Sequence, residues 1–213
     1  MQPPKQDHYR LARQAAAERL RRSVDPQRLE ARGARLDEGA RTVTVSSLCW
    51  EFRVQLDPFA MAVLPMDAEV ADVWQVLVLE YLTAPNPVTP SGFLSFADFA
   101  EGRGYLSAFE SRVTRRLSAT AGRARAAFLA ACERLGAAPT QDEPVRCIFR
   151  FLPLLELQVV RHEGDEDFPP SCNVLFSDNL LSVASMEGGI VAAERLVSAL
   201  EGKTPAVRRA GAP

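Results

Sequence analysis

The spacing between apolar side chains changes twice along this sequence. Residues 50–56 alternate apolar and polar side chains, as a strand with one buried face does. Residues 70–82 repeat apolar side chains at helical spacing, and the alternation returns over 145–159. Strands at both ends of a helical middle predict an α+β fold. We expect an antiparallel or mixed sheet built from N- and C-terminal hairpins and packed against a central group of helices.

Turn residues divide these patterns into elements. Residues 43–48 and 50–56 predict the first hairpin, and residues 145–151 and 155–159, with a turn at Pro153, predict the second. A helix capped by Asp67 is expected to run to residue 82, and its nearly continuous apolar surface makes it the central buried helix. Further helices are expected over residues 106–117, 128–135 and 190–200.

Charge divides the 213-residue chain into three parts. Residues 1–41 carry ten Lys and Arg but six Asp and Glu, and are expected to form a basic N-terminal helical arm. Residues 42–201 are expected to be a single α+β domain, and residues 202–213 a flexible C-terminal tail. The central domain carries 12 basic and 21 acidic residues. Since such a domain repels a phosphate backbone, we expect no nucleic-acid partner.

The same sequence predicts a cytoplasmic protein without a membrane partner. It lacks the run of roughly 18 apolar residues that a membrane helix needs, and it starts without the apolar core of a secretion signal. Its four cysteines are widely spaced and lack any C-x-x-C pair, so they are expected to be reduced thiols.

One polar segment concentrates potential metal ligands. We call residues 162–171 the acidic loop; it holds His162, Asp165, Glu166 and Asp167. Carboxylates around a glycine can converge on a divalent cation, and an imidazole extends the choice to transition metals. The alternative is structural: Asp165 hydrogen-bonds local backbone donors, and Phe168 plugs the core. The spacing differs from that of a calcium-binding loop.

Catalytic motifs are otherwise lacking. The chain has neither the G-x-S-x-G pattern of a nucleophile elbow nor a phosphate-binding P-loop, and no cysteine lies near a histidine in sequence. We therefore name no catalytic residue and predict no cofactor, with a divalent metal as the open alternative.

Several segments together resemble the bacterial and archaeal family known as domain of unknown function 3786. They are residues 78–82, 93–96, 102–105, 135–136 and 175–176 and, most specifically, the Gly-Asp-Glu-Asp-Phe-Pro segment over 164–169. The resemblance spans residues 68–187. Family members are often associated with iron-sulfur modules of the kind found with corrinoid proteins. This chain lacks such a cysteine cluster, so the resemblance implies a fold and a surface but no reaction.

These observations predict a binding or accessory module rather than an enzyme. Its working surface is expected to combine the Pro-rich loop 85–92, the turn 102–105 and the acidic loop in a shared cleft. The binding residues are expected to be Gly104, Tyr105, Asp165, Glu166, Asp167 and Phe168. The partner, a protein or a small ligand, stays open. One alternative is a metal-dependent, hydrolase-like enzyme with His162, Asp165, Glu166 and Asp167 at the metal. Another is an accessory protein of a corrinoid or tetrapyrrole system.

Overall fold

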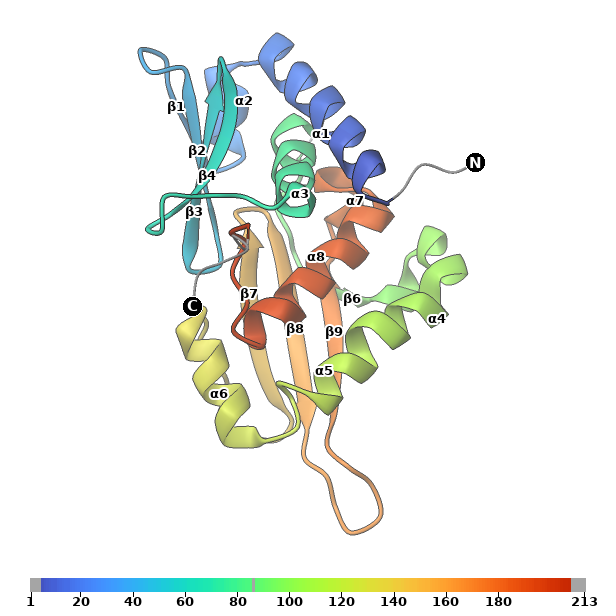
Figure 1. The fold of residues 1–213 in the computed structure, drawn as a ribbon. Helices are drawn as coiled ribbons and strands as arrows, with labels where there is room; N and C mark the ends of the chain where they lie inside the picture. Colours follow the sequence, from blue (N-terminus) through green and yellow to red (C-terminus); the bar gives the residue numbers. More distant parts are fainter. Residues whose placement is uncertain (1–4, 86, 208–213) are drawn as a thin grey trace.

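Two antiparallel sheets and the helices around them make up the protein (Figure 1). The computed structural model describes residues 5–85 and 87–207. One sheet belongs to the N-terminal part of the chain, and the other is formed almost entirely by the C-terminal part. The predicted α+β class is therefore confirmed, although the strands lie in two sheets rather than one.

The N-terminal sheet is a meander in which each strand pairs with the next. Its strands are β1 (Ala34–Asp37), β2 (Thr42–Ser47), β3 (Trp50–Leu56), β4 (Phe59–Leu64) and β5 (Ala68–Glu69). The predicted first hairpin is β2–β3, with Val45 opposite Phe52. The residues of β3 alternate as the period of two requires: Phe52, Val54 and Leu56 are buried, and the polar residues between them are not. Strands β4 and β5, which follow β3 directly in the chain, complete this sheet, and none of the described C-terminal strands pairs with it.

The C-terminal sheet has the order β6-β9-β8-β7. Its strands are β6 (Phe93–Ser95), β7 (Val145–Leu152), β8 (Leu155–His162) and β9 (Ser171–Ser177). The predicted second hairpin is β7–β8. At the other side of the sheet, β6 pairs with β9 across about eighty residues of intervening chain, with Phe93 opposite Ser177.

Helices pack around and between the sheets (Figure 1). They are α1 (Lys5–Arg22), α2 (Pro26–Ala31), α3 (Asp72–Thr83), α4 (Leu106–Phe109), α5 (Arg115–Ala119), α6 (Arg125–Arg134), α7 (Leu180–Val183) and α8 (Met186–Leu200). A π-helical turn, Glu110–Thr114, joins α4 to α5 into one continuous segment, and 3-10 turns occupy Phe96–Asp98 and Ala100–Tyr105. None of the helices within the described residues is both long and apolar enough to cross a membrane.

Helix α3 connects the two sheets, as its predicted central position requires. Trp74 stacks on Phe151 of β7 with ring centroids 5.2 Å apart, and its edge meets Trp50 of β3 at 6.0 Å. At the other end of α3, the Tyr81 hydroxyl donates to Arg32 O at 2.6 Å and accepts from Leu154 N at 3.1 Å. The core is therefore continuous from one sheet to the other.

Several boundaries differ from those expected from sequence. Asp67 does not cap α3: it forms an ion pair with Arg53 in a turn with a φ of +47°, and the cap position is Ala71. Within the segment expected as a helical arm, residues 34–37 form β1, because Gly33 with a φ of +68° turns the chain into the sheet.

At the C-terminus, the first part of the expected flexible tail contacts the fold. Val207 N donates to Glu69 O at 2.8 Å, and Ala71 N donates to Pro205 O at 2.9 Å. Residues 208–213 of this expected tail, like residues 1–4 of the expected arm, lie outside the described residues.

Candidate functional site

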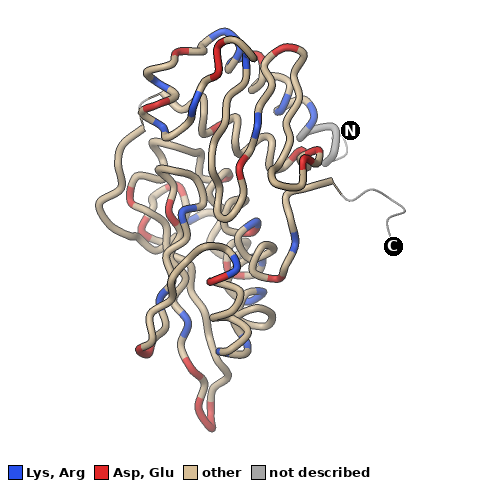
Figure 2. The backbone as a smooth tube through the Cα atoms, turned by 90° about the vertical axis from the view of Figure 1, so that its left-hand side faces the viewer, with Lys and Arg blue, Asp and Glu red and all other residues tan. Residues whose placement is uncertain are grey.

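The acidic loop extends the β8–β9 hairpin beyond the sheet. His162 opposite Ser171 is the last pair of the ladder, so residues 163–170 leave the sheet together. Figures 1 and 2 show this segment projecting from one end of the molecule, with Asp and Glu at its tip. The loop is thus a protrusion, not the wall of a cleft.

The shape of this tip is set by hydrogen bonds within the loop. The Asp165 carboxylate accepts from Asp167 N at 2.9 Å and from Phe168 N at 2.8 Å, while Asp165 N donates to Phe168 O at 2.9 Å. A side chain at Gly164 would lie 2.7 Å from Phe168 O and from Pro170. The structural interpretation of Asp165 is therefore confirmed: its carboxylate holds local backbone donors.

Phe168 does not plug the core, which corrects the other half of that interpretation. Its side chain is 71% exposed, the highest value among the large apolar residues in the described part of the chain that are exposed. The reason is geometric. The loop forms a tight turn between Gly164 and Phe168 soon after it leaves the sheet, and the Phe168 side chain lies outside this turn. Glu166 and Asp167 are also exposed beside it.

A buried arginine supports the base of the loop. Arg161 is fully buried; its Nε donates to Gly122 O at 2.8 Å, and its two terminal nitrogens each lie 3.0 Å from a Glu163 oxygen. The hydrogen bonds from Arg161 hold the pKa of Glu163 below its usual value. Glu143 in turn accepts from Glu163 N at 3.3 Å and forms an ion pair with Arg125 of α6. These contacts fix the hairpin to α6 and to the residues after α5.

Arg161 is not among the residues predicted from the sequence, although a signal for it is present. Leu155, Leu157, Val159 and Arg161 occupy alternate positions of β8, and all four are buried. A charged residue on the apolar face of a strand must be paired, because an isolated buried charge is very unfavourable.

The other predicted binding residues lie elsewhere. Tyr105, 52% exposed, and Gly104 precede α4, and the helical segment 106–119 separates them from the acidic loop by about 20 Å of helix. That segment ends near the loop, where Ser118 Oγ accepts from Cys172 N at 2.9 Å. The two sets of residues therefore do not form one surface.

The Pro-rich loop is at the opposite end of β9. Ser91 N donates to Asp178 at 3.0 Å, and Val88 N donates to Ser182 Oγ at 3.1 Å. Asn86 lies outside the described residues. Since Asp178 follows β9 and the acidic loop precedes it, the expected shared cleft of three loops is not formed.

The candidate metal ligands do not converge in this structure. Asp165 faces the backbone of its own loop, and His162, Glu166 and Asp167 are exposed. Across residues 5–85 and 87–207, no three His, Cys, Asp or Glu side chains are close enough together to hold a metal ion. The metal assignment stays a prediction.

Comparison with known proteins places this fold in a family. A family model for a domain of unknown function (DUF3786) matches residues 25–199, which include both sheets and α2 to α8 apart from the last residue of α8. No match was found among the curated proteins or among the solved structures. The chain therefore belongs to the domain of unknown function 3786 family, as the resemblance of its segments implied.

Proposed function

We propose that this protein is a non-catalytic binding module whose acidic loop presents Phe168 to a protein partner. The observation that supports the proposal is a 71% exposed aromatic side chain on a loop with a fixed backbone. Large aromatic side chains are the residues that most often dominate the binding energy of protein interfaces. Exposing one to water has no benefit for the stability of the isolated chain.

The fixed backbone favours binding because it lowers the entropy cost. Hydrogen bonds to Asp165 already hold the loop, and Pro169 and Pro170 restrict its backbone further. A partner therefore has to order fewer residues than it would in a flexible loop.

The expected partner surface is an apolar pocket with a basic rim. Phe168 would fill the pocket, while Glu166 and Asp167 would face Lys and Arg side chains around it. Carboxylates at the exposed edge of an interface contribute to the association rate and to its salt dependence more than to affinity.

The test compares two exposed aromatic residues. The full chain, its Phe168→Ala variant and its Tyr105→Ala variant are immobilised, and proteins retained from the source cell extract are quantified by mass spectrometry. We expect proteins that bind the parent and Tyr105→Ala to be lost with Phe168→Ala, and to elute at raised salt. Equal retention by all three forms would contradict the proposal, and selective loss with Tyr105→Ala would transfer the binding role to the turn 102–105.

The metal-dependent enzyme and the corrinoid or tetrapyrrole accessory role stay predictions from sequence. Elemental mass spectrometry on chelator-free protein tests the first of them directly. Near-stoichiometric metal that disappears in a variant combining Asp165→Asn, Glu166→Gln and Asp167→Asn would favour the enzyme.

A further inference from the structure

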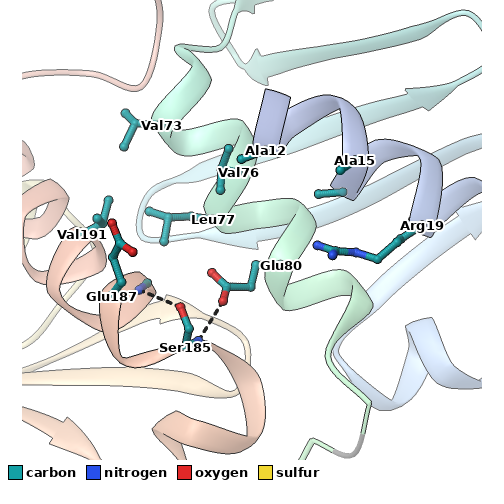
Figure 3. A pocket seen from close by; sticks show the side chains of 12 residues that line it. Ala12, Ala15, Arg19, Val73, Val76, Leu77, Glu80, Ser185, Glu187 and Val191 are labelled. Carbon is teal, nitrogen blue, oxygen red and sulfur yellow. Dashed lines mark hydrogen bonds between the residues drawn. The ribbon is translucent and has the colours of Figure 1, made fainter. Parts of the chain in front are cut away.

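A cavity of about 290 Å³ lies far from the acidic loop, between α1, α3 and the start of α8 (Figure 3). Such a volume is near the lower limit of ligand pockets, roughly 300–1,000 Å³. Its walls are mostly apolar, and the side chains that form them include Ala12, Ala15, Val73, Val76, Leu77 and Val191.

Small side chains on α1 create the space. Helix α1 lines the cavity with Ala12, Ala15 and Ala16, whose side chains end at Cβ. The helix is nevertheless attached among these alanines and beyond them: Arg13 forms an ion pair with Asp72 at 2.8 Å, and Arg21 donates to Leu56 O at 2.6 Å. The cavity therefore lies between helices that are held in place by other contacts.

Two carboxylates line this apolar space. Glu80 of α3 is held in place by Ser185, whose backbone N donates to Glu80 Oε1 at 2.8 Å. Glu187 lies in the first turn of α8, one turn from Val191, and is exposed at the opening. Figure 3 shows Leu77 between the two carboxylates in that view. Ser185 also caps α8, since its Oγ accepts from Gly188 N at 3.0 Å.

The charges of the cavity are not matched by the protein. Within the described residues, neither Glu80 nor Glu187 forms an ion pair, whereas Glu18, Asp72, Glu194 and Glu201 do. Arg19 lines the opening from α1 and is exposed. With one positive and two negative side chains, the cavity has a net negative charge.

We propose that this cavity binds a small organic cation, an ammonium group carried by a compact aliphatic body. The ammonium would donate a hydrogen bond to Glu80 Oε2, with the exposed Glu187 adding negative charge at the opening, and the aliphatic body would contact Val73, Leu77 and Val191. An ammonium is the complement of two carboxylates, and the apolar walls favour a ligand that has carbon on its other side.

Three ligands that differ mainly in the polar group test the proposal. The full chain is titrated by calorimetry with isoamylamine, isoamyl alcohol and isovaleric acid, and amide chemical shifts locate the site. We expect the amine to shift resonances over residues 73–80 and 185–191 and to bind about tenfold or more tighter than the alcohol, with the acid weakest. Binding of the acid as tightly as the amine, or no binding of the amine, would overturn the proposal.

Two variants separate the contribution of the Glu80 charge to binding from the contribution of the free space in the cavity. Glu80→Gln keeps an oxygen that can accept from Ser185 N, so the helices stay in place while the charge is lost. It should weaken the amine about tenfold and leave the alcohol unchanged. Ala15→Phe should fill the space and abolish binding of both ligands.

The matched control is Glu133→Gln. Glu133 is an exposed glutamate of α6 that does not line the cavity, and its replacement should change neither affinity. Native-like amide spectra of all three variants show that each has folded. If Glu80→Gln and Glu133→Gln bound the amine as tightly as the parent does, the assignment of Glu80 would be wrong.

Discussion

Charged side chains are treated in opposite ways at the two ends of this molecule. At the base of the acidic loop, Arg161 is fully buried, and its guanidinium nitrogens donate to Gly122 O and to the Glu163 carboxylate. At the α1–α3–α8 cavity, Glu80 is half-buried and Glu187 is exposed, and neither forms an ion pair in the described part of the chain. The first arrangement is complete within the chain, and the second is not.

This difference separates groups that hold the fold from groups that are available to another molecule. A buried charge with all its partners contributes to a particular geometry, and the loss of one partner leaves the other unsatisfied. An unmatched carboxylate beside a cavity contributes little to stability, so its replacement should be tolerated. The following predictions test the distinction.

The largest effect is expected at Arg161. Arg161→Met keeps much of the side-chain volume but leaves Gly122 O and Glu163 without their donor, and should lower the free energy of unfolding by about 3 kcal/mol. Urea denaturation measures this change. Arg103→Met, at an exposed arginine, is the control and should stay within about 0.5 kcal/mol. A loss below about 1 kcal/mol for Arg161→Met would show that the network does not hold the fold.

The Tyr81 hydroxyl also joins two distant segments through buried hydrogen bonds, and its loss is expected to lower stability less than the loss of Arg161. Tyr81→Phe removes the group that joins Arg32 O to Leu154 N, and we expect a loss of about 1–2 kcal/mol in the free energy of unfolding. Burial raises the pKa of Tyr81 above its usual value, so the hydroxyl stays protonated and remains a donor. Tyr105→Phe changes an exposed residue and should have no measurable effect; equal losses for both variants would contradict the assignment.

Acid should reveal a third matched group, Glu201 at the end of α8. Arg116 donates to it through Nε at 2.8 Å, and these bonds, with Lys203, lower the pKa of Glu201 to about 2 from its usual 4.5. A lowered pKa contributes stability that is fully present above pH 4.5 and is lost as the pH falls toward 2.

Glu201→Gln should therefore lower stability at neutral pH and make the acid decline between these values shallower than in the parent. Chemical denaturation at a series of pH values gives both slopes. Because the other carboxylates titrate in both proteins, the difference between the slopes belongs to Glu201. Parallel slopes would mean that the ion pair does not contribute.

The smallest effect is expected at the cavity. Glu80→Gln keeps the hydrogen bond from Ser185 N and should change the free energy of unfolding by less than about 1 kcal/mol in either direction. A larger loss, in the same urea experiment, would place Glu80 with the groups that hold the fold and remove the contrast between the two ends.

Local patterns predicted the elements of this fold better than their assembly. The alternation over 50–56 and 145–159 identified β3, β7 and β8 because one face of each is buried. Strands β4 and β5 were missed: Met61 and Val63 are buried in a short apolar run without polar residues between them, and β5 has two residues. Without them, the N-terminal sheet appeared incomplete and the two hairpins were assigned to one sheet.

The two candidate sites differ in how far apart their contacting residues lie in the sequence. The sequence identified the acidic loop and the role of Asp165 because the hydrogen bonds there join residues two or three apart. Glu80 and Ser185 are 105 positions apart, and no local pattern indicates that they meet. The sequence left Phe168 open between the binding surface and the core, because a single aromatic residue near a strand is most often buried. Its 71% exposure rules out the core position.

The pairing of β6 with β9 has a consequence for the order in which the protein can fold during synthesis. All five strands of the N-terminal sheet have been made once residue 69 is reached, whereas the C-terminal sheet requires residue 177. At about 5–20 residues per second, the ribosome takes on the order of 5–20 s to cover that interval. Within it, β6 has no strand to pair with from residue 95 until β9 is made at residues 171–177, and Trp74 lacks the ring of Phe151 until residue 151 is reached. The nascent chain therefore exposes an aromatic surface that a chaperone can recognise.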